Sequence, residues 1–338
     1  MGEIVYTQWL NERGTLEADL TITQLAEDKF MVVATDTAHR HVESHMARHF
    51  GAEASAVVTD VTGAYTQLNI QGPHSRTLMS ELTDTDMSDE AFPFRAAKEV
   101  ALGYARPMVT RITYLGELGY ELFIPSEQAL HVYDKIVAVG EGHGLVHAGL
   151  KALASLRMEK GYRDYGHDLD NTDTLLEAGL GFTADFDKPG GFIGREAVLA
   201  QKASVGGSVA KLPKRMIQVV LEDPEPFLHH GEVVYRDGEI VGDVRAGSFG
   251  HTVRHAARPC PNPRSARTIA GGGGPCVDMV CALAAGRSGR AGDVRERQRR
   301  AGQQGLRRGR RVGGGRRGHA LPRARFPATA VRPGQQPD

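Results

Sequence analysis

The sequence predicts an α+β fold over residues 1–253, followed by a separate basic tail. Segments with strand-like alternation and segments with helix-like periodicity are interspersed along the first part. The charge divides at the same point: residues 254–338 hold 19 Arg, no Lys and 4 acidic residues, a net charge of 19 − 4 = +15. Because the whole chain of 338 residues balances to zero, residues 1–253 carry 0 − 15 = −15. We therefore interpret the two parts separately.

Two strands and a helix are the first elements expected. Apolar and polar residues alternate over residues 17–24, and residues 29–35 predict a second strand. Asp36 or Thr37 can cap a helix that continues to about Phe50. The apolar stripe of this helix consists of Val42, Met46 and Phe50.

A further strand and helix follow. Residues 64–72 predict a strand that ends at Gly72-Pro73. Because proline is favoured in the first turn of a helix, a helix is expected to begin here. The spacing of Leu78 and Leu82 turns both side chains toward the core.

The remaining elements begin with a hairpin signature. Strand-like residues 105–115, the tight turn GELG and a returning strand at 120–125 predict this hairpin. Two helices are expected at residues 126–139 and 148–160. A separate antiparallel β unit completes the elements, with strands in 215–223 and 231–244 and a hairpin turn at Asp237-Gly238.

Residues 254–338 do not resemble part of a packed domain. This tail has no apolar period and contains one aromatic residue, Phe326. Such a composition cannot bury enough apolar area to offset chain entropy, so we expect disorder. Three interpretations are open: an Arg/Gly tail that binds RNA, an ordinary disordered tail, and a shifted reading frame near codon 253 in GC-rich DNA. The absence of Lys beside 19 Arg favours the shifted frame over nucleic-acid binding.

Composition and motifs exclude several classes of protein. All three cysteines lie in the tail, which argues against a disulfide framework or thiolate catalysis in residues 1–253. That part also contains no dinucleotide-binding, P-loop or nucleophile-elbow motif. No run of about 18 apolar residues predicts a membrane span. The N-terminal residues do not form a secretory signal, so we expect a cytoplasmic protein.

Two acidic residues near the start are candidates for chemistry. In GTLEADLTI, one residue separates Glu17 from Asp19, so in a regular strand both carboxylates would share a face. A buried carboxylate that faces an amine can accept its proton or stabilise positive charge beside it. Two solvated acids on an exposed edge are the alternative.

Further candidates lie at the end of a predicted helix and in the predicted hairpin. Glu159, in SLRMEKGYRDYG, lies at the end of a helix, where its carboxylate can accept two donors from a pterin-like ring. An ordinary ion pair with Lys160 or Arg157 is the alternative. The stretch Tyr114–Glu121 combines aromatic, acidic and glycine residues, which can contact a flat heterocycle or simply form a good hairpin.

His41, His45 and His49 recur every four residues and could line one face of a helix. Three imidazoles at that spacing can bind zinc. However, they lie beside the apolar stripe, with no HExxH motif and no carboxylate ligand placed by a motif. We therefore interpret them as a solvated helix flank and expect no metal site.

Six segments, taken in order, resemble a known family. They are GTLEADLTITQL, LNIQGPHS, TRITYLGELGYELFIP, HAGLKALASLRMEKGYRDYGHDL, LEAGLGF and GGFIGREAV. Residues 1 to about 252 are similar to the glycine-cleavage T-protein, or aminomethyltransferase, family. They most resemble the version fused behind the flavin domain of dimethylglycine and sarcosine dehydrogenases or oxidases. The combination is specific, although no single segment is.

The resemblance implies an architecture and a set of site residues. The fold would consist of packed α+β subdomains around a central folate channel, with a folate-binding domain at 1–205 and the start of a C-terminal β domain at 206–253. Asp19 matches the acid that contacts the folate amine nitrogens and assists transfer, and Glu159 matches the acid that holds the pterin ring. The other positions that match the folate pocket are Tyr6, Thr21, Val33, Tyr114, Glu121 and Tyr165.

The chemistry implied by the resemblance is the capture of a one-carbon unit. A nitrogen of tetrahydrofolate attacks the electrophilic carbon of an iminium or aminomethyl group, and methylenetetrahydrofolate results. The donor would derive from a methylated amine such as sarcosine or dimethylglycine. A flavin-dependent dehydrogenase domain or subunit would be the partner. A non-catalytic folate-binding protein and an inactive truncated gene product are the alternatives.

Two departures from the family pattern matter. The chain begins inside the first subdomain, and the family's flavin-binding domain is not in the sequence, so FAD would require a separate or missing domain. After Gly250-His251-Thr252 the family continues into a β-barrel portion, whereas this chain continues into the basic tail. We therefore expect a domain truncated at both ends, which would lose core area and stability.

Overall fold

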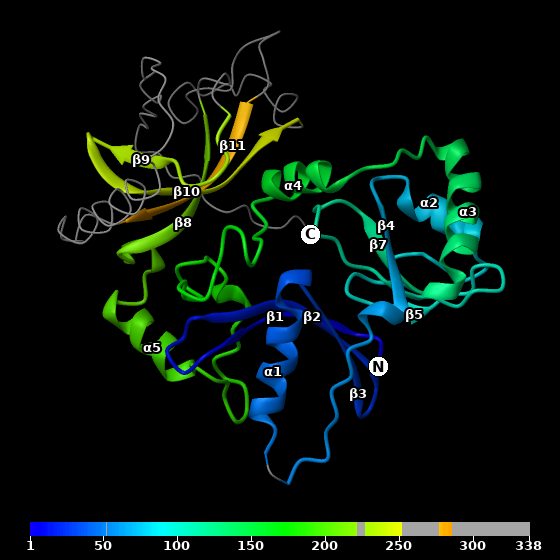
Figure 1. Ribbon diagram of the computed structural model, residues 1–338, viewed down its shortest axis with the longest axis horizontal. Helices are drawn as coiled ribbons and strands as arrows, with labels where there is room; N and C mark the ends of the chain where they lie inside the picture. The colour runs from blue at the N-terminus through cyan, green and yellow to red at the C-terminus, as the bar shows by residue number, and fades with distance from the viewer. Residues whose placement is uncertain (52, 222–226, 252–276, 286–338) are drawn as a thin grey trace, which may run out of the picture.

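The computed structural model describes residues 1–51, 53–221, 227–251 and 277–285. Three β-sheets from successive parts of the chain lie in different regions of the molecule, and helices cover them (Figure 1). This mixed arrangement confirms the predicted α+β class. Apart from residues 277–285, the predicted tail at 254–338 lies outside the described residues, as do Cys260 and Cys276.

The first sheet has the order β1-β2-β3 and is antiparallel. Its strands are β1 (Ile4–Leu10), β2 (Leu16–Ala26) and β3 (Lys29–Ala34), and α1 (His39–His49) follows them. One face of the sheet packs on α1, where Ala18 and Leu20 meet Ala38 and Val42. Sequence analysis anticipated β2, β3 and the helix, but not β1. Phe50, expected in the apolar stripe, is 38% exposed because the helix ends before it.

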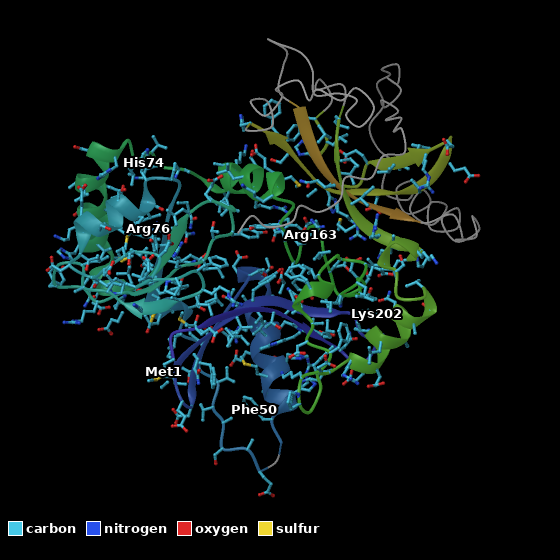
Figure 2. All side chains as sticks on the ribbon, turned by 180° about the vertical axis from the view of Figure 1, so that it is seen from behind. Met1, Phe50, His74, Arg76, Arg163 and Lys202 are labelled. Carbon is cyan, nitrogen blue, oxygen red and sulfur yellow. The ribbon has the colours of Figure 1, made fainter. Side chains whose placement is uncertain are left out.

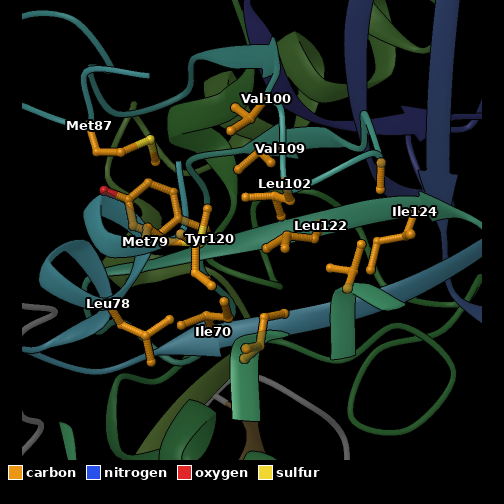
Figure 3. Close-up of a cluster of buried hydrophobic side chains, with 14 of the residues drawn as sticks. Ile70, Leu78, Met79, Met87, Val100, Leu102, Val109, Tyr120, Leu122 and Ile124 are labelled. Carbon is orange, nitrogen blue, oxygen red and sulfur yellow. The ribbon is translucent and has the colours of Figure 1, made fainter. Parts of the chain in front are cut away.

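The second sheet has the order β4-β7-β6-β5. Its elements in chain order are β4 (Tyr65–Gln71), α2 (Ser75–Leu82), β5 (Ala97–Glu99), β6 (Met108–Thr110), β7 (Gly119–Pro125) and α3 (Ala129–Gly140). Helices α2 and α3 contact β7, where Tyr120, Leu122 and Ile124 point into one apolar cluster (Figure 3). Leu78 and Leu82 are buried in that cluster, as predicted.

The prediction of a tight hairpin turn at GELG is wrong. Strands β6 and β7 do pair antiparallel, but Thr110 at the end of β6 lies opposite Glu121. The connection is therefore residues 111–118 rather than a short turn. Pairing with β7 ends at Thr110, whereas Arg111 still bonds on the β5 side, where its amide donates to the carbonyl of Ala96 at 2.8 Å. This longer connection carries Tyr114 away from the sheet.

The third sheet has the order β8-β11-β10-β9. Its strands are β8 (Lys214–Val220), β9 (Val233–Arg236), β10 (Glu239–Gly250) and β11 (Val277–Ala285). The predicted turn between β9 and β10 is confirmed: Asp237 and Gly238 have φ values of 55° and 85°, as in a type I′ hairpin. Sequence analysis did not anticipate β11, which lies within residues 254–338 and pairs with both β8 and β10.

Two further helices, α4 (Leu150–Glu159) and α5 (Arg195–Ser204), accompany the first and third sheets. Short 3₁₀ helices complete the structure at Asp36–Ala38, Thr62–Ala64, Ser126–Gln128, Glu141–His143, Gly181–Thr183 and Val209–Lys211. No helix in the part of the chain that the structure describes is long and apolar enough to cross a membrane.

One apolar cluster, which we call the shared core, joins the first sheet to the third. The shared core consists of Leu10, Leu16, Met158, Leu169, Leu175, Leu176, Ala178, Leu180, Val198, Leu212, Met216 and Ala246. It contains side chains from β1, β2, α4, α5, β8 and β10. The loop after α4 runs between these elements and supplies several of the leucines. Residues of that loop are therefore held close to the first sheet.

Candidate functional site

Three of the predicted folate-pocket residues form one row across the first sheet. Tyr6 of β1 lies opposite Thr21 of β2, and Thr21 lies opposite Val33 of β3. All three side chains are partly buried. The row lies on the face away from α1, because Ala18 and Leu20, which alternate with these positions, form the face that packs on α1.

Asp19 lies on the same face, two residues before Thr21 on β2. Directly opposite, Gln8 of β1 donates from Nε2 to Oδ1 of Asp19 at 2.8 Å. Burial raises the pKa of the Asp19 carboxyl to about 6, against the lowering effect of hydrogen bonds from Gln8 and Tyr6. Asp19 is therefore a desolvated acid held in a fixed orientation, and not a solvated acid on an exposed edge.

Two tyrosine hydroxyls lie within electrostatic reach of Asp19. Burial raises the pKa of Tyr6 far above its ordinary value, and the charge of Asp19 acts in the same direction. Burial also raises the pKa of Tyr114, whose hydroxyl donates to the carbonyl oxygen of Arg163 at 2.6 Å. Both phenols stay protonated at neutral pH, so they offer neutral hydrogen-bonding groups.

A buried ion pair supports the loop that carries Arg163. Arg163 is labelled near the middle of the view in Figure 2. On α4, Arg157 donates from Nη1 to Oδ2 of Asp168 at 2.6 Å, and their side chains are 5% and 0% exposed. The same Nη1 donates to the carbonyl of Tyr162 at 2.9 Å, and the amide of Asp164 donates to Oδ1 of Asp168 at 2.5 Å. Sequence analysis missed this pair, because it depends on how the loop folds back.

Tyr165 and Thr183 reach the first sheet from far along the chain. The Tyr165 hydroxyl donates to the carbonyl of Leu16 at 3.4 Å, and burial raises its pKa to about 12. The Thr183 hydroxyl donates to Oε1 of Gln8, whose Nε2 binds Asp19. Gln8 is therefore fixed from two sides. Sequence analysis did not identify it, because β1 was not predicted to be a strand.

The two remaining predicted acids lie on other elements. On β7, burial raises the pKa of the Glu121 carboxyl to about 7, and its backbone carbonyl accepts the Thr110 hydroxyl at 3.3 Å. None of the hydrogen bonds described for these residues joins Glu121 to Asp19. Glu159 is the last residue of α4 and is partly buried. The role of both acids in folate binding stays a prediction.

The expectation that Glu17 and Asp19 share a face is wrong. Trp9 lies opposite Ala18 and Leu10 lies opposite Leu16, so Glu17 has no partner on β1. This is a β-bulge, and one unpaired residue reverses the alternation of the strand before it. Leu16 therefore joins the shared core, whereas Glu17 turns to the other side and contacts His41 of α1 at 2.8 Å.

The expectation of a solvated histidine flank is wrong for His45. Its side chain is buried, with the residue 7% exposed, and its ring stacks on Trp9 with centroids 5.4 Å apart. Burial lowers the pKa of His45. Only one turn away on either side, His41 and His49 keep more solvent contact. The helix therefore turns this histidine toward the sheet and not toward water.

Comparison with known proteins decides the family. Residues 1–188 match the family model of the GCVT N-terminal domain, and residues 214–257 match that of the glycine cleavage T-protein C-terminal barrel domain. The chain belongs to the glycine cleavage T-protein family. The resemblance seen in the sequence is therefore confirmed over the part that carries the Asp19 site.

Two relatives show which kinds of protein this chain is similar to. Over 254 residues the chain is 40% identical to 4-methylaminobutanoate oxidase (formaldehyde-forming) of Paenarthrobacter nicotinovorans, a match that covers 75% of this chain and 30% of the relative. Over 266 residues it is 36% identical to human mitochondrial sarcosine dehydrogenase. This match covers 75% of this chain and 28% of the relative. The chain thus spans less than a third of the length of these relatives.

A solved structure agrees with the fold. The glycine cleavage system aminomethyltransferase T from Bartonella henselae superposes with a TM-score of 0.63 at 22% identity, over 84% of this chain and 75% of that one. At this identity the likeness shows the fold alone. It confirms the aminomethyltransferase-type arrangement that the sequence predicted.

Proposed function

We propose that this chain binds tetrahydrofolate and transfers to it a one-carbon unit from a donor derived from a methylated amine. The observation that carries the proposal is the position of Asp19, a desolvated carboxyl held by Gln8 beside the row of Tyr6, Thr21 and Val33. Membership of the glycine cleavage T-protein family supports the same function.

The residues present fit a folate in their chemistry. Tyr6 and Tyr114 offer aromatic faces and neutral hydroxyls to a flat heterocycle. The carboxyl groups of Asp19 and Glu159 can accept hydrogen bonds from ring and amine N–H groups. Thr21 and Val33 add a small, partly apolar surface beside Tyr6.

Asp19 and Gln8 have separate roles in the proposed reaction. Tetrahydrofolate, when bound, supplies the nitrogen that accepts the one-carbon unit. Asp19 takes up a proton at a carboxyl oxygen or stabilises positive charge beside it, and Gln8 keeps that carboxyl oriented. Because the site is desolvated, these interactions are stronger than in water. The larger part of the rate enhancement comes from positioning.

The names of two relatives support a proposal for the donor and the partner. One is named an oxidase of 4-methylaminobutanoate and the other a sarcosine dehydrogenase, so both act on methylated amines. We propose that a flavin-dependent domain or subunit oxidises such an amine and that this chain receives the carbon. FAD would be held by that domain and not by this chain.

Titration of the purified chain with tetrahydrofolate tests the binding part of the proposal. We expect saturable heat in calorimetry, lost in Glu159→Ala and kept in Glu141→Ala, a matched control at an exposed glutamate. Circular dichroism of the same samples reports folding. A folded wild-type chain without folate binding would refute the proposal. An unfolded chain would identify the polypeptide as an inactive gene product.

A substitution of Asp19 tests the transfer part. We predict that Asp19→Ala lowers one-carbon transfer by about 10²–10⁴-fold, the contribution typical of a positioned acid or base, with folate affinity largely kept. Asp28→Ala, at an exposed acid of the β2–β3 turn, should change neither property. Full transfer activity in Asp19→Ala would show that the role of Asp19 is wrong. Folate binding without transfer in the wild type would favour the non-catalytic alternative.

A further inference from the structure

The β-bulge in β2 directs one carboxylate to a pair of histidines. Glu17 is the unpaired residue of the bulge, and its Oε2 lies 2.8 Å from Nε2 of His41. In a regular strand Glu17 would face the same side as Asp19, away from α1. Bulges commonly re-aim a side chain in this way next to a functional site. The contact between β2 and α1 therefore depends on the one extra residue.

The two histidines have the spacing that a helix needs to present a chelating pair. His41 and His45 are four residues apart on α1, so their side chains lie one turn apart on the same face. Their rings are tilted with centroids 6.1 Å apart. One ligand atom from each of Glu17, His41 and His45 lies within 4.8 Å of the other two.

These distances suit a small divalent ion. Zinc binds imidazole nitrogen at about 2.0–2.1 Å and carboxylate oxygen at about 2.0–2.2 Å, which in a tetrahedron separates the ligand atoms by roughly 3.4 Å. The 2.8 Å contact and the 4.8 Å limit bracket that separation. The three ligand atoms therefore lie close to the separations that a tetrahedral site requires.

Neighbouring side chains hold two of the three groups in orientation. Asn11 donates from Nδ2 to Oε1 of Glu17 at 2.8 Å, which leaves Oε2 directed at His41. Trp9 stacks on the ring of His45 with an interplanar angle of 20°. Such outer contacts fix the direction of ligands in metal sites.

We propose that Glu17, His41 and His45 form a binding site for a divalent transition-metal ion of the Zn²⁺ type. Imidazole and carboxylate ligands without thiolate favour zinc, nickel or cobalt over softer ions. Three protein ligands leave a fourth position open for water or an anion. The His41 side chain is 41% exposed, which gives the ion a path from solvent.

The proposed site would fasten α1 to β2 on the face opposite Asp19. It is separate from the folate proposal, because neither histidine belongs to the row of folate candidates. An ion bound there would stabilise the folded chain by linkage, since it binds the assembled helix and strand and not the separated ones. The expected sign of binding is therefore a rise in melting temperature.

The test uses the full chain with Zn²⁺ or Co²⁺ as the only added probe. We expect one-to-one binding in calorimetry, a higher melting temperature with Zn²⁺, and Co²⁺ absorption bands of a nitrogen and oxygen site. Cys260, Cys276 and Cys281 could bind the ion elsewhere. Co²⁺ bound to them would show a thiolate charge-transfer band, and that spectrum as the only signal would overturn the proposal.

Matched variants make the test specific. Glu17→Gln and His41→Gln each remove one ligand at a partly exposed side chain, and each should weaken Zn²⁺ binding by at least about 100-fold. His49→Gln, one turn further along α1, should keep the affinity. Circular dichroism without metal confirms that each variant folds. Unchanged binding in the ligand variants, or equal loss in His49→Gln, would refute the site, as would a wild-type chain that binds no Zn²⁺.

Discussion

Glu121 and Asp19 show how burial sets the protonation of single side chains in this protein. Burial raises the pKa of Asp19 to about 6 although two hydrogen bonds act against it. The pKa of Glu121 rises to about 7, with burial as its cause. Both carboxyl groups therefore lie in surroundings that disfavour charge. Groups of this kind gather at binding and catalytic sites more often than elsewhere.

The raised pKa of Glu121 makes stability depend on pH with a definite sign. The folded chain binds this proton more tightly than the unfolded chain, so its stabilising effect is complete below the unfolded pKa and is lost as pH rises toward 7. We predict that Glu121→Gln raises the free energy of unfolding at pH 8 by on the order of 2 kcal/mol and leaves it nearly unchanged at pH 4. Urea denaturation at the two pH values measures it; an equal effect at both would contradict the prediction.

The sequence could predict some of these residues but not their partners. The family resemblance predicts Asp19 and Glu159, and it also predicts Tyr6, Thr21 and Val33, which the structure brings into one row. Gln8 could not be predicted, because its importance comes from lying opposite Asp19 in a strand that the pattern did not reveal. The face of Glu17 was predicted wrongly, because a one-residue bulge leaves no clear mark in the alternation of side chains.

At the scale of elements, α4 is fixed to the loop after it by the buried pair of Arg157 and Asp168. The pair is almost fully desolvated, and backbone groups satisfy further atoms of both side chains. Desolvation of two charges is costly, so the pair contributes little net stability as a unit. Removal of one partner, however, leaves the other charge buried with much weaker compensation.

This asymmetry gives a prediction for α4. Asp168→Asn should lower the free energy of unfolding by about 3–5 kcal/mol, because the buried Arg157 loses its 2.6 Å partner and keeps only the more distant, partly exposed Asp164 at 3.8 Å. The control is Glu196→Gln, which removes the exposed pair of Arg195 and Glu196 and should cost less than about 1 kcal/mol. Denaturant unfolding of both variants measures the two losses in free energy of unfolding. Similar losses in the two would show that burial does not control the effect.

Most elements were predictable because they have long periodic or alternating patterns. Helices α2, α3 and α4 and strands β2, β3, β4 and β7 to β10 all lie close to their expected ranges. The segment 105–115 was read as one strand, but only β6 within it pairs with β7. Its later residues have a strand-like composition but make contacts outside the sheet. One of these is the hydrogen bond from the Tyr114 hydroxyl to the carbonyl of Arg163. Tertiary contacts of this kind override local preference.

At the scale of the molecule, different contacts join the three sheets. The shared core joins the first sheet to the third through apolar contact. Backbone hydrogen bonds join the first sheet to the second, where the amide of Ile4 donates to the carbonyl of Arg95 at 2.9 Å and that of Ala97 to Gly2 at 2.7 Å. The second sheet keeps its own apolar cluster with α2 and α3. Damage to the shared core should therefore spread further than damage elsewhere.

Met216 tests how far such damage spreads. Met216→Ala should lower the free energy of unfolding by about 2–4 kcal/mol and speed hydrogen exchange in β1 and β2 as well as in β8. Val234→Ala is the control, because Val234 packs only within the small cluster of the third sheet. Its effect on exchange should stay in that sheet. Faster exchange confined to β8 in Met216→Ala would contradict a shared core.

The long reach of the contacts around Asp19 has a consequence for the order of events during synthesis. The hydrogen bonds from Tyr165 to Leu16 and from Thr183 to Gln8 span 149 and 175 residues. At a translation rate of about 5–20 residues per second, Gln8 and Leu16 are synthesised roughly 7–35 s before these partners. Contacts so distant along the chain also form slowly after release. The face that carries Asp19 is therefore completed late, and the nascent first sheet must avoid association with other chains until then.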